Sequence, residues 1–245
     1  MTPLQYCKDR VAQPGSTLYY SLLYLPPENR DALYALFAFR DELMALLAPS
    51  SSMDLSTKKV AWWFDEVERF SRGQPRHPIM RALKDNVCPS AHSVTRDLLA
   101  ALADEPSSNE DRWQEKFSSH SGSSIALAAA LHCGYTNHTN SELVRKLGLG
   151  CAASESFRMG KSSDAQCIKQ TISMLDHTFK TIAQPDRYNL LGLLTMAALN
   201  SAFLKRTSLD EGQIRTTRDI TPLTKLWIAW KTERRERKLS RKHKI

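Results

Sequence analysis

The chain has 245 residues, 42% hydrophobic and 24% charged, with nine glycines and a formal net charge of +8. This length allows a substantial buried core, and the composition is typical of a globular protein, not of a disordered, collagen-like or disulfide-stapled chain. The five cysteines include no Cys-x-x-Cys pair, which argues against a zinc cluster and a disulfide framework. The longest apolar runs, residues 125–131 and 190–199, are too short to cross a bilayer as a helix.

The positive charge is concentrated at the C-terminal end. Residues 231–245 contain eight Lys and Arg and two Glu, a net charge of +6, which leaves +2 for the rest of the chain. We therefore predict a folded domain over residues 1–230 and a basic tail over residues 231–245. The first ten residues show no apolar signal-peptide region, so we expect a cytoplasmic location.

Apolar residues recur with helical periodicity along most of the chain, and strand-type alternation is rare, so we predict an all-α, single-domain protein. The first clear helix starts at Pro26–Pro27, because proline is tolerated in a first turn and Glu28 suits the positive end of the helix dipole. Its apolar residues continue to Ala48, before Pro49.

The later elements follow the same pattern. A serine-rich connector is predicted over residues 50–56, a turn over 73–78 and a loop over 104–111. Further helices are predicted over residues 57–72, 92–103, 123–132, 141–157, 165–182, 187–207 and 223–239.

Residues 148–153, GLGCAA, fit the GxGxxA form of a dinucleotide-binding fingerprint. That fingerprint needs a strand to deliver its glycines to a helix N-terminus, whereas residues 141–147 have a helical pattern. We therefore interpret the small residues as a place of close helix packing. The seven histidines form no HxxxH or HExxH pair, and we interpret them as surface or packing residues.

Three separated blocks of sequence point to a family. The first is GSTLYYS at residues 15–21, followed by LPP and YALFAF. AWWFDEV at residues 61–67 continues it with HPI, and the third block is TPLTKLWIAW at residues 221–230. Together they resemble the squalene/phytoene synthase family, and the third block resembles its bacterial presqualene diphosphate synthase branch. The resemblance implies an all-α isoprenoid synthase-type helical bundle around a central cavity, in which members join two prenyl diphosphates head to head.

The first aspartate-rich motif of that family, DDxxD, is missing here. Carboxylates at i and i+4 lie on one helix face, where they hold Mg²⁺ and through it the diphosphate. An ungapped alignment from Tyr34 to Phe39 places Met44, Ala45 and Ala48 at the three aspartate positions. The resemblance therefore implies that this metal site has lost its ligands.

The second aspartate-rich motif, of the form QLTNILRDVxED, should fall in LGLGCAASESFRMGKSS. If Arg158 is the retained arginine, Glu155 replaces the asparagine and Met159 the first aspartate. Ser162 and Ser163 then replace the final acidic pair. The resemblance thus implies that both metal sites are degenerate, and we expect no catalytic residue, no metal ligand and no cofactor.

An alternative is a displaced Mg²⁺ site. Asp41, Glu42, Asp65 and Glu66 are acidic and lie in the matching helices. The competing interpretation is that Glu42 and Glu66 form structural salt bridges. Under the first alternative the chain is a divergent but active prenyltransferase that uses Mg²⁺ and acts on farnesyl or geranylgeranyl diphosphate.

The energetics favour a pseudoenzyme. Metal ions at the leaving group supply several kcal/mol of transition-state stabilisation. Each 1.36 kcal/mol changes the rate about tenfold, so the loss of every metal carboxylate costs many orders of magnitude. An apolar lining still suits a prenyl or lipid chain, whose burial is worth about 0.8 kcal/mol per methylene. The alternative is that Met44 and Ala48 fill ordinary core. The candidate pocket residues are Tyr20, Phe37, Arg40, Asp41, Met44, Ala48, Gly122 and Arg158.

The C-terminal helix combines an apolar face with the basic run. Such a helix can lie in a membrane interface, where each cation near anionic lipid contributes about 1 kcal/mol. Nucleic acid is a less favoured partner because aromatic residues are not interleaved through the tail, and a solvated, frayed end is the remaining interpretation. The predicted membrane or partner surface consists of Trp227, Trp230, Arg234, Arg235, Arg237 and Lys238.

The sequence thus predicts a non-catalytic protein that binds a prenyl or lipid ligand, or a protein partner, at the cytoplasmic face of the inner membrane. The family includes a non-catalytic branch linked to the assembly of respiratory complex I, so the resemblance also implies a scaffold role.

Overall fold

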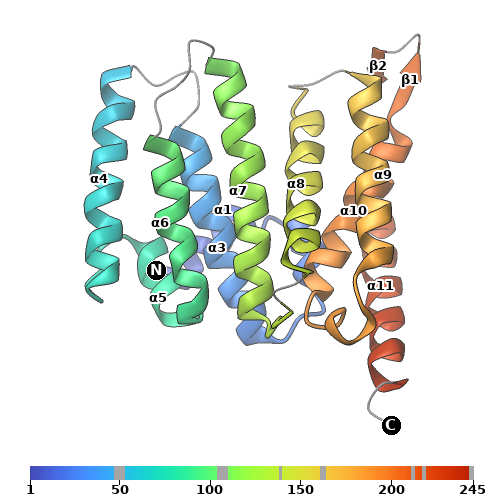
Figure 1. Ribbon diagram of the computed structural model, residues 1–245, viewed down its shortest axis with the longest axis horizontal. Coiled ribbons are helices and arrows are strands. Elements are labelled where there is room, and N and C mark those ends of the chain that lie inside the picture. Colours follow the sequence, from blue (N-terminus) through green and yellow to red (C-terminus); the bar gives the residue numbers. More distant parts are fainter. Residues whose placement is uncertain are drawn as a thin grey trace. The chain divides into compact units, whose positions relative to one another are not determined.

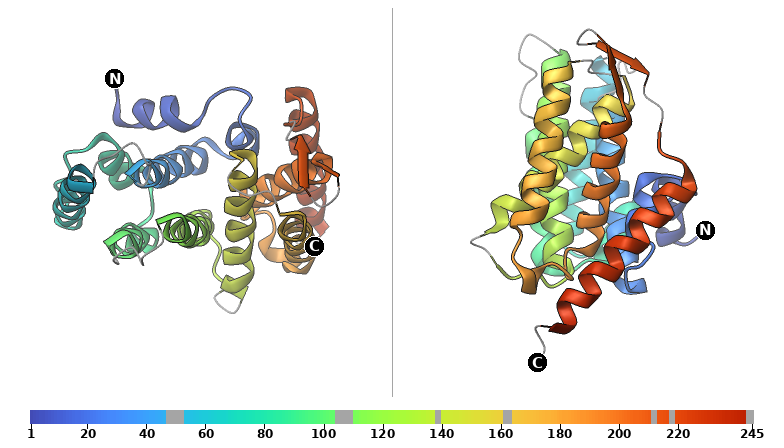
Figure 2. Two further views of the ribbon diagram at one scale, coloured as in Figure 1. Left: turned by 90° about the horizontal axis from the view of Figure 1, so that it is seen from above. Right: turned by 90° about the vertical axis from the view of Figure 1, so that its right-hand side faces the viewer.

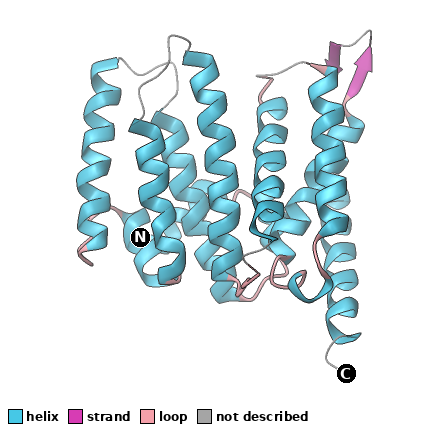
Figure 3. Ribbon diagram, viewed as in Figure 1, coloured by secondary structure: helices cyan, strands magenta, loops and turns pink. Residues whose placement is uncertain are grey.

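The computed structural model describes residues 1–46, 53–103, 110–137, 140–160, 164–210, 213–216 and 219–242. These residues are mostly helical (Figure 3), and the strands among them form one short antiparallel hairpin, β1 (Ser208–Asp210) with β2 (Gln213–Thr216). The predicted all-α class is confirmed. Of the described helices, none is both long enough and apolar enough to span a membrane.

The chain divides into two compact units, and each contains a segment from near the N-terminus. Unit 1 comprises Met1–Gln13 and Pro26–His132, and unit 2 comprises Pro14–Leu25 and Cys133–Ile245. The boundary predicted after residue 230 lies within helix α11 (Pro222–Lys242), which continues through it. The division into a domain and a basic tail stays a prediction.

Unit 1 contains six helices among its described residues (Figure 1), and four of them begin at a proline, the residue whose fixed φ suits a first turn. In α1, the Thr2 side chain accepts a hydrogen bond from the backbone N–H of Gln5 at 3.1 Å, which satisfies one of the free donors at the helix start. The helices are α1 (Pro3–Val11), α3 (Pro27–Leu46), α4 (Met53–Ser71), α5 (Pro78–Asn86), α6 (Pro89–Ala103) and α7 (Glu110–His132).

Helix α3 is the centre of unit 1, where it packs against α1, α5 and α7. Its apolar residues Leu36, Phe39 and Leu43 are fully buried. The Phe39 ring meets the Trp63 ring of α4 edge to face, with 5.6 Å between the centroids. The predicted helix from Pro27 is therefore confirmed as far as Leu46, and Ala48 lies outside the described residues.

Helix α7 begins well before the predicted start at Ser123. The segment SSHSGSS, residues 118–124, is helical, and Ser121 and Ser124 are buried in it. The Ser121 hydroxyl donates to the backbone carbonyl of Ser118 at 3.0 Å, so the buried hydroxyl is satisfied within its own helix. Residues 104–109 of the predicted loop lie outside the described part of the chain, and residues 110–111 open α7.

Unit 2 is built around α10, which is apolar on all sides and is therefore buried by its neighbours. It packs against α2, α8, α9 and α11, and α11 runs obliquely to α9 and α10 (Figure 2). The predicted start at Arg187 was early, because α10 begins at Leu191. The elements are α2 (Thr17–Leu22), α8 (Ser141–Arg158), α9 (Ala165–Thr181), the 3₁₀ turn η2 (Gln184–Asp186), α10 (Leu191–Arg206), β1, β2 and α11.

The glycine-rich segment GLGCAA lies inside α8 and not at a helix N-terminus. A Cβ atom on Gly150 would lie 2.6 Å from Cδ2 and 2.8 Å from Cγ of Leu175 in α9. Any larger residue at this position would require the Leu175 side chain or the helices to shift. The interpretation of this segment as a place of close helix packing is confirmed.

Candidate functional site

The positions aligned with the first aspartate-rich motif lie at the C-terminal end of α3. Met44 is half-buried and Ala45 is exposed. The Met44 sulfur lies 4.0 Å from the hydroxyl of Ser121 in α7, and Nε of the buried Arg40 donates to the same hydroxyl at 3.2 Å. Unit 1 thus brings Arg40 and Met44 together beside Gly122, the next residue of α7, in a small polar contact with Ser121.

Asp41 and Glu42, two residues of the alternative Mg²⁺ site, both pair with Arg10 of α1. Nε of Arg10 lies 2.8 Å from Asp41 Oδ2, and its Nη1 lies 2.9 Å from Glu42 Oε2. One guanidinium therefore bridges two neighbouring carboxylates and joins α1 to α3. A divalent cation at this place would have to displace it.

Glu66, the third of these acidic residues, is a fully buried structural anchor. Its Oε1 accepts hydrogen bonds from the backbone N–H groups of Arg76 and His77 at 2.6 and 2.7 Å, and its Oε2 lies 3.3 Å from Arg69 Nη1. A carboxylate so placed orders the backbone that enters α5 and suits the positive end of that helix. Asp65, in contrast, is exposed.

These contacts confirm the interpretation of Glu42 and Glu66 as structural salt-bridge residues. Nowhere in the described ranges do three or more His, Cys, Asp or Glu side chains gather as a metal site would require.

His77 sits among aromatic rings in unit 1. Its ring makes edge-to-face contacts with Tyr6, Trp62 and Trp63 at centroid distances of 5.9, 5.7 and 5.0 Å. Its Nδ1 accepts from the backbone N–H of Ile79 at 3.3 Å, which caps α5. Burial lowers the pKa of His77, and the charges of nearby carboxylates offset only part of that effect. The sequence interpretation of His77 as a packing residue agrees with these contacts.

Arg158, aligned with the retained arginine of the second motif, lies at the end of α8 in unit 2. Its guanidinium packs over the Phe203 ring at 4.2 Å, and Nη2 donates to Oδ1 of the buried Asn200 at 3.3 Å. Nε of Arg158 lies 3.7 Å from Asp219 Oδ1. Asp219 also pairs with the buried Lys225 of α11 at 2.6 Å.

Lys225 joins two of the sequence blocks that resemble the family. Its Nζ donates to the backbone carbonyl of Gly15 at 2.7 Å, across 210 positions of sequence. Gly15 immediately precedes Ser16, whose hydroxyl caps α2 by accepting from the N–H of Tyr19. The first and third blocks therefore meet in unit 2 to hold α2.

The remaining predicted positions are spread over both units. Tyr20 is half-buried on α2, with its ring 5.2 Å from that of Tyr19, and Phe37 is half-buried on α3. In the aligned second motif, Glu155 is half-buried in α8 and Met159 is 65% exposed at the end of that helix. Ser162 and Ser163 lie outside the described residues.

The predicted membrane or partner surface lies on one face of α11. Trp227 is 54% exposed and Trp230 is 42% exposed. The Lys231 ammonium lies 4.7 Å from the centre of the Trp227 ring, and the Arg234 guanidinium lies 5.0 Å from that of Trp230. Aromatic rings and cations therefore alternate along an exposed surface, in cation–π contact.

The opposite face of α11 is buried and polar. Ala229, Thr232, Glu233 and Glu236 are buried, and so is Lys225. Glu233 forms an ion pair with Arg237, whose Nε lies 2.5 Å from Glu233 Oε1. Nε of Arg235 lies 3.2 Å from Glu236 Oε1. Of the six predicted surface residues, Arg235 and Arg237 thus also have carboxylate partners on their own helix.

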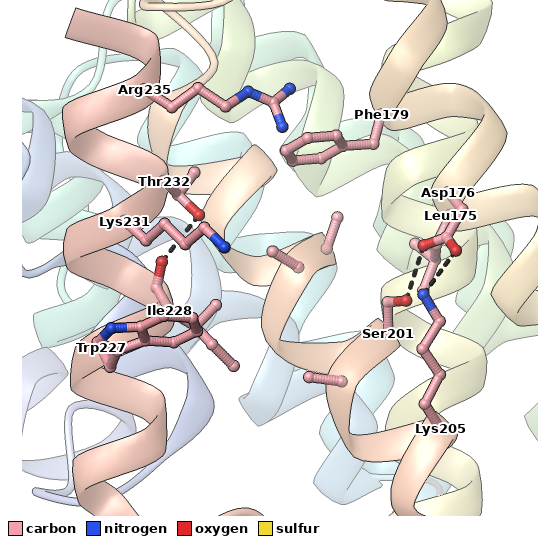
Figure 4. A pocket seen from close by; sticks show the side chains of 13 residues that line it. Leu175, Asp176, Phe179, Ser201, Lys205, Trp227, Ile228, Lys231, Thr232 and Arg235 are labelled. Carbon is pink, nitrogen blue, oxygen red and sulfur yellow. Dashed lines mark hydrogen bonds and ion pairs between the residues drawn. The ribbon is translucent and has the colours of Figure 1, made fainter.

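Two features of unit 2 were missed by the sequence interpretation. The first is a buried ion pair between Arg187 and Glu236, with two contacts of 2.6 and 2.9 Å. The second is an open groove of about 370 Å³ bounded by α9, α10 and α11 (Figure 4). The ion pair was missed because Glu236 lies within the basic run, where a carboxylate is expected to be solvated. The groove was missed because the three helices that line it are separated in sequence.

Comparison with known proteins agrees with the sequence resemblance. The sequence model of the squalene/phytoene synthase family matches residues 11–147, more than half of the chain. No curated protein matches the chain. The matched range covers nearly all of unit 1 and extends to the middle of α8 in unit 2. On the strength of this match and of the helical fold, the chain belongs to the squalene/phytoene synthase family.

Proposed function

We propose that this chain is a non-catalytic member of the squalene/phytoene synthase family that attaches to an anionic membrane surface through α11. There it binds a prenyl or lipid ligand or holds a protein partner during assembly. The proposal has two parts, the loss of diphosphate chemistry and the gain of a membrane surface, and each has its own test.

The loss of catalysis is supported by the state of the acidic side chains. Met44 and Ala45 stand at aligned aspartate positions, and neither offers an oxygen ligand for Mg²⁺. Asp41 and Glu42 are held by Arg10, and Glu66 is buried in hydrogen bonds to backbone N–H groups. A displaced metal site would have to break these contacts, which join α1 to α3 and α4 to the start of α5.

The observation that carries the membrane part is the reversed polarity of α11. An ordinary surface helix buries its apolar residues and exposes its charges. In α11, Leu223, Trp227 and Trp230 are exposed, whereas Glu233 and Glu236 are buried. The outward face therefore offers indole rings and cations with its carboxylates turned away, which is the composition of an interfacial helix on anionic lipid.

The test of catalysis is diphosphate release from farnesyl diphosphate by the purified chain with Mg²⁺, with and without NADPH. We expect release no faster than from an unrelated helical protein of similar charge. Release that is abolished by chelation of Mg²⁺ would overturn the non-catalytic part. In that case Asp41→Asn, Glu42→Gln, Asp65→Asn and Glu66→Gln would show which carboxylates hold the metal.

The test of membrane attachment is co-sedimentation with vesicles. We expect the chain to bind vesicles of phosphatidylcholine with about 30% of the anionic lipid phosphatidylglycerol more tightly than vesicles of phosphatidylcholine alone. Binding should weaken as salt rises from about 0.05 to 0.5 M, because the surface charges are screened. Equal binding to both kinds of vesicle, or none, would contradict the membrane part.

A further inference from the structure

The groove in unit 2 has a floor of small apolar side chains and a charged rim. Ala197, Ala198 and Ala202 of α10 form the floor, with Leu175 of α9 and Ile228 of α11 beside them. Ala198 and Ala202 are half-buried, so their methyl groups border open space. The volume of about 370 Å³ is in the range of small-molecule sites.

The cations of the groove outnumber its carboxylates. Among the lining residues, Asp176 is the acidic one, and it is already paired with Lys205 at 2.6 Å and with the Ser201 hydroxyl at 2.8 Å. These contacts hold the pKa of Asp176 below its usual range although burial opposes them. The charge of Lys205 is therefore neutralised within the groove by Asp176.

Lys231 and Arg235 provide the surplus charge. Both extend from α11 toward the space that Phe179 borders from α9 (Figure 4). Lys231 contacts the Trp227 ring and has no carboxylate at ion-pair distance among the described residues. Arg235 lies over the Phe179 ring at 4.7 Å, and the carboxylate it touches, Glu236, is already paired twice with Arg187.

The groove is continuous with the exposed face of α11, because Trp227 belongs to both. A ligand that enters from a membrane at this face meets aromatic rings first, then two cations, then an apolar floor. We propose that the groove binds one anionic phospholipid, with its phosphate at Lys231 and Arg235 and the upper part of one acyl chain over Ala198 and Ala202. This assignment deepens the proposed membrane attachment and rests on it for the source of the lipid.

Photo-crosslinking tests the groove without requiring attachment to a bilayer. The full chain is mixed with detergent micelles that contain phosphatidylglycerol with a diazirine on one acyl chain, and crosslinked peptides are mapped by mass spectrometry. We expect crosslinks on residues 197–205 of α10 and on Phe179. Crosslinks confined to the exposed face of α11, or scattered over both units, would overturn the proposal even if the chain co-sediments with vesicles.

Two sets of variants sharpen the test. Ala198→Leu with Ala202→Leu fills the floor with good helix formers, and we expect it to lower groove crosslinking at least about fivefold while vesicle binding persists. Lys231→Gln with Arg235→Gln should lower it about tenfold. The matched control is Arg234→Gln with Lys238→Gln, which removes the same charge from α11 outside the groove; it should weaken vesicle binding but leave groove crosslinking unchanged. An equal loss from both charge pairs would mean general attraction to the helix and would overturn a specific phosphate site.

Competition identifies the source of the ligand. Inorganic phosphate and soluble farnesyl diphosphate are added separately to the crosslinking mixture at the concentration of the phospholipid. We expect neither to protect the groove peptides. Protection by farnesyl diphosphate would replace the phospholipid with a soluble prenyl diphosphate, and protection by phosphate alone would reduce the site to a simple anion site. Groove crosslinks in micelles without vesicle binding would leave the groove standing and remove the membrane part of the proposed function.

Discussion

At the scale of single residues, Arg187 and Glu236 form a buried ion pair in unit 2. Arg187 is 3% exposed, and it donates to both oxygens of Glu236 and to the backbone carbonyls of Phe179 and Ile182. The pair joins α11 to the segment between α9 and α10. The Arg187 guanidinium loses its hydration on burial. The fold therefore depends on these hydrogen-bond partners to offset the cost of burying the charge.

Removal of one partner of this pair should be costly. We expect Glu236→Gln to lower the free energy of unfolding by about 3–5 kcal/mol, because Arg187 would remain buried without its counter-charge. Denaturant titration followed by circular dichroism measures it. The control is Glu68→Gln, which breaks the exposed pair with Arg72 on α4 and should cost less than about 1 kcal/mol. Similar costs for the two variants would contradict this account.

Two histidines of unit 1 should make the free energy of unfolding depend on pH. Nδ1 of His132 accepts from the N–H of Cys88 at 3.1 Å, and Nδ1 of His77 accepts from Ile79, so both rings are needed neutral. Burial lowers both pKa values below 6.5 in the folded chain. As the pH falls below about 6.5, the two histidines are protonated in the unfolded chain but remain neutral in the folded chain. The free energy of unfolding therefore decreases with falling pH, by up to about 1.4 kcal/mol per pH unit for each ring.

The measurement is a series of urea titrations between about pH 7.5 and 5, a range that brackets the ordinary histidine pKa. His132→Asn keeps an acceptor for the Cys88 N–H but cannot be protonated, and it should flatten part of the decrease. His177→Asn on the exposed side of α9 should leave the slope as it is. If His132→Asn retains the full slope, the buried ring is not a source of the pH dependence.

At the scale of elements, contact geometry between helices is set by a few small residues. Gly150 in α8 lies directly against Leu175 in α9, and Leu175 also borders the groove. The distance between α8 and α9 thus fixes the position of one wall of the proposed lipid site.

A methyl group at position 150 should therefore force the two helices apart. We expect Gly150→Ala to lower the free energy of unfolding by about 1–3 kcal/mol, a net loss although alanine is the better helix former by about 1 kcal/mol. In a Leu175→Ala background the clash disappears, and the same change should become neutral or stabilising. A double-mutant cycle from thermal or denaturant unfolding measures this coupling. Independent effects of the two substitutions would show that the helices are not in strained contact at this point.

At the scale of the whole molecule, exposed large apolar side chains are unevenly distributed. Four of the nine among the described residues lie on α11, and two lie on α4. Only on α11 are they accompanied by a dense basic run, since α4 carries acidic residues around Trp62 and Phe64. The exposed rings of α11 therefore have the composition of an interfacial surface, whereas those of α4 are scattered exposed hydrophobic residues, which are normal in proteins.

The difference between the two helices predicts a selective effect on membrane binding. Trp227→Ser with Trp230→Ser should weaken partition into anionic vesicles by about 2 kcal/mol, some thirtyfold, because two half-exposed rings no longer enter the interface. Trp62→Ser on α4 removes a ring of similar exposure and should change partition little. Co-sedimentation over a range of lipid concentrations gives both values. Equal effects at the two helices would argue against α11 as the membrane surface.

The sequence predicted the long helices well because their apolar periodicity is strong, as in α3, α8 and α9. It missed the first half of α7 because SSHSGSS has a polar, loop-like composition, while in the fold Ser121 and Ser124 are buried small residues. The contacts of Glu42 and Glu66 as structural residues were foreseen, but their partners Arg10 and the backbone before α5 were not. The groove could not be predicted, because it needs the relative placement of three helices and its alanines look like ordinary core.

The bond from Lys225 to the Gly15 carbonyl has a consequence for synthesis. All six helices described in unit 1 have been synthesised once residue 132 is added, a little over halfway along the chain, but the helix at residues 17–22 has its partners in α10 and α11, far later in the sequence. This segment must therefore wait, looped out between two parts of a unit that is already available to fold. Non-local contacts of this kind slow folding and leave apolar surface open in the meantime. A stop codon before residue 191 would remove both partner helices and make that wait permanent, which turns a short N-terminal segment into a site for chaperone capture.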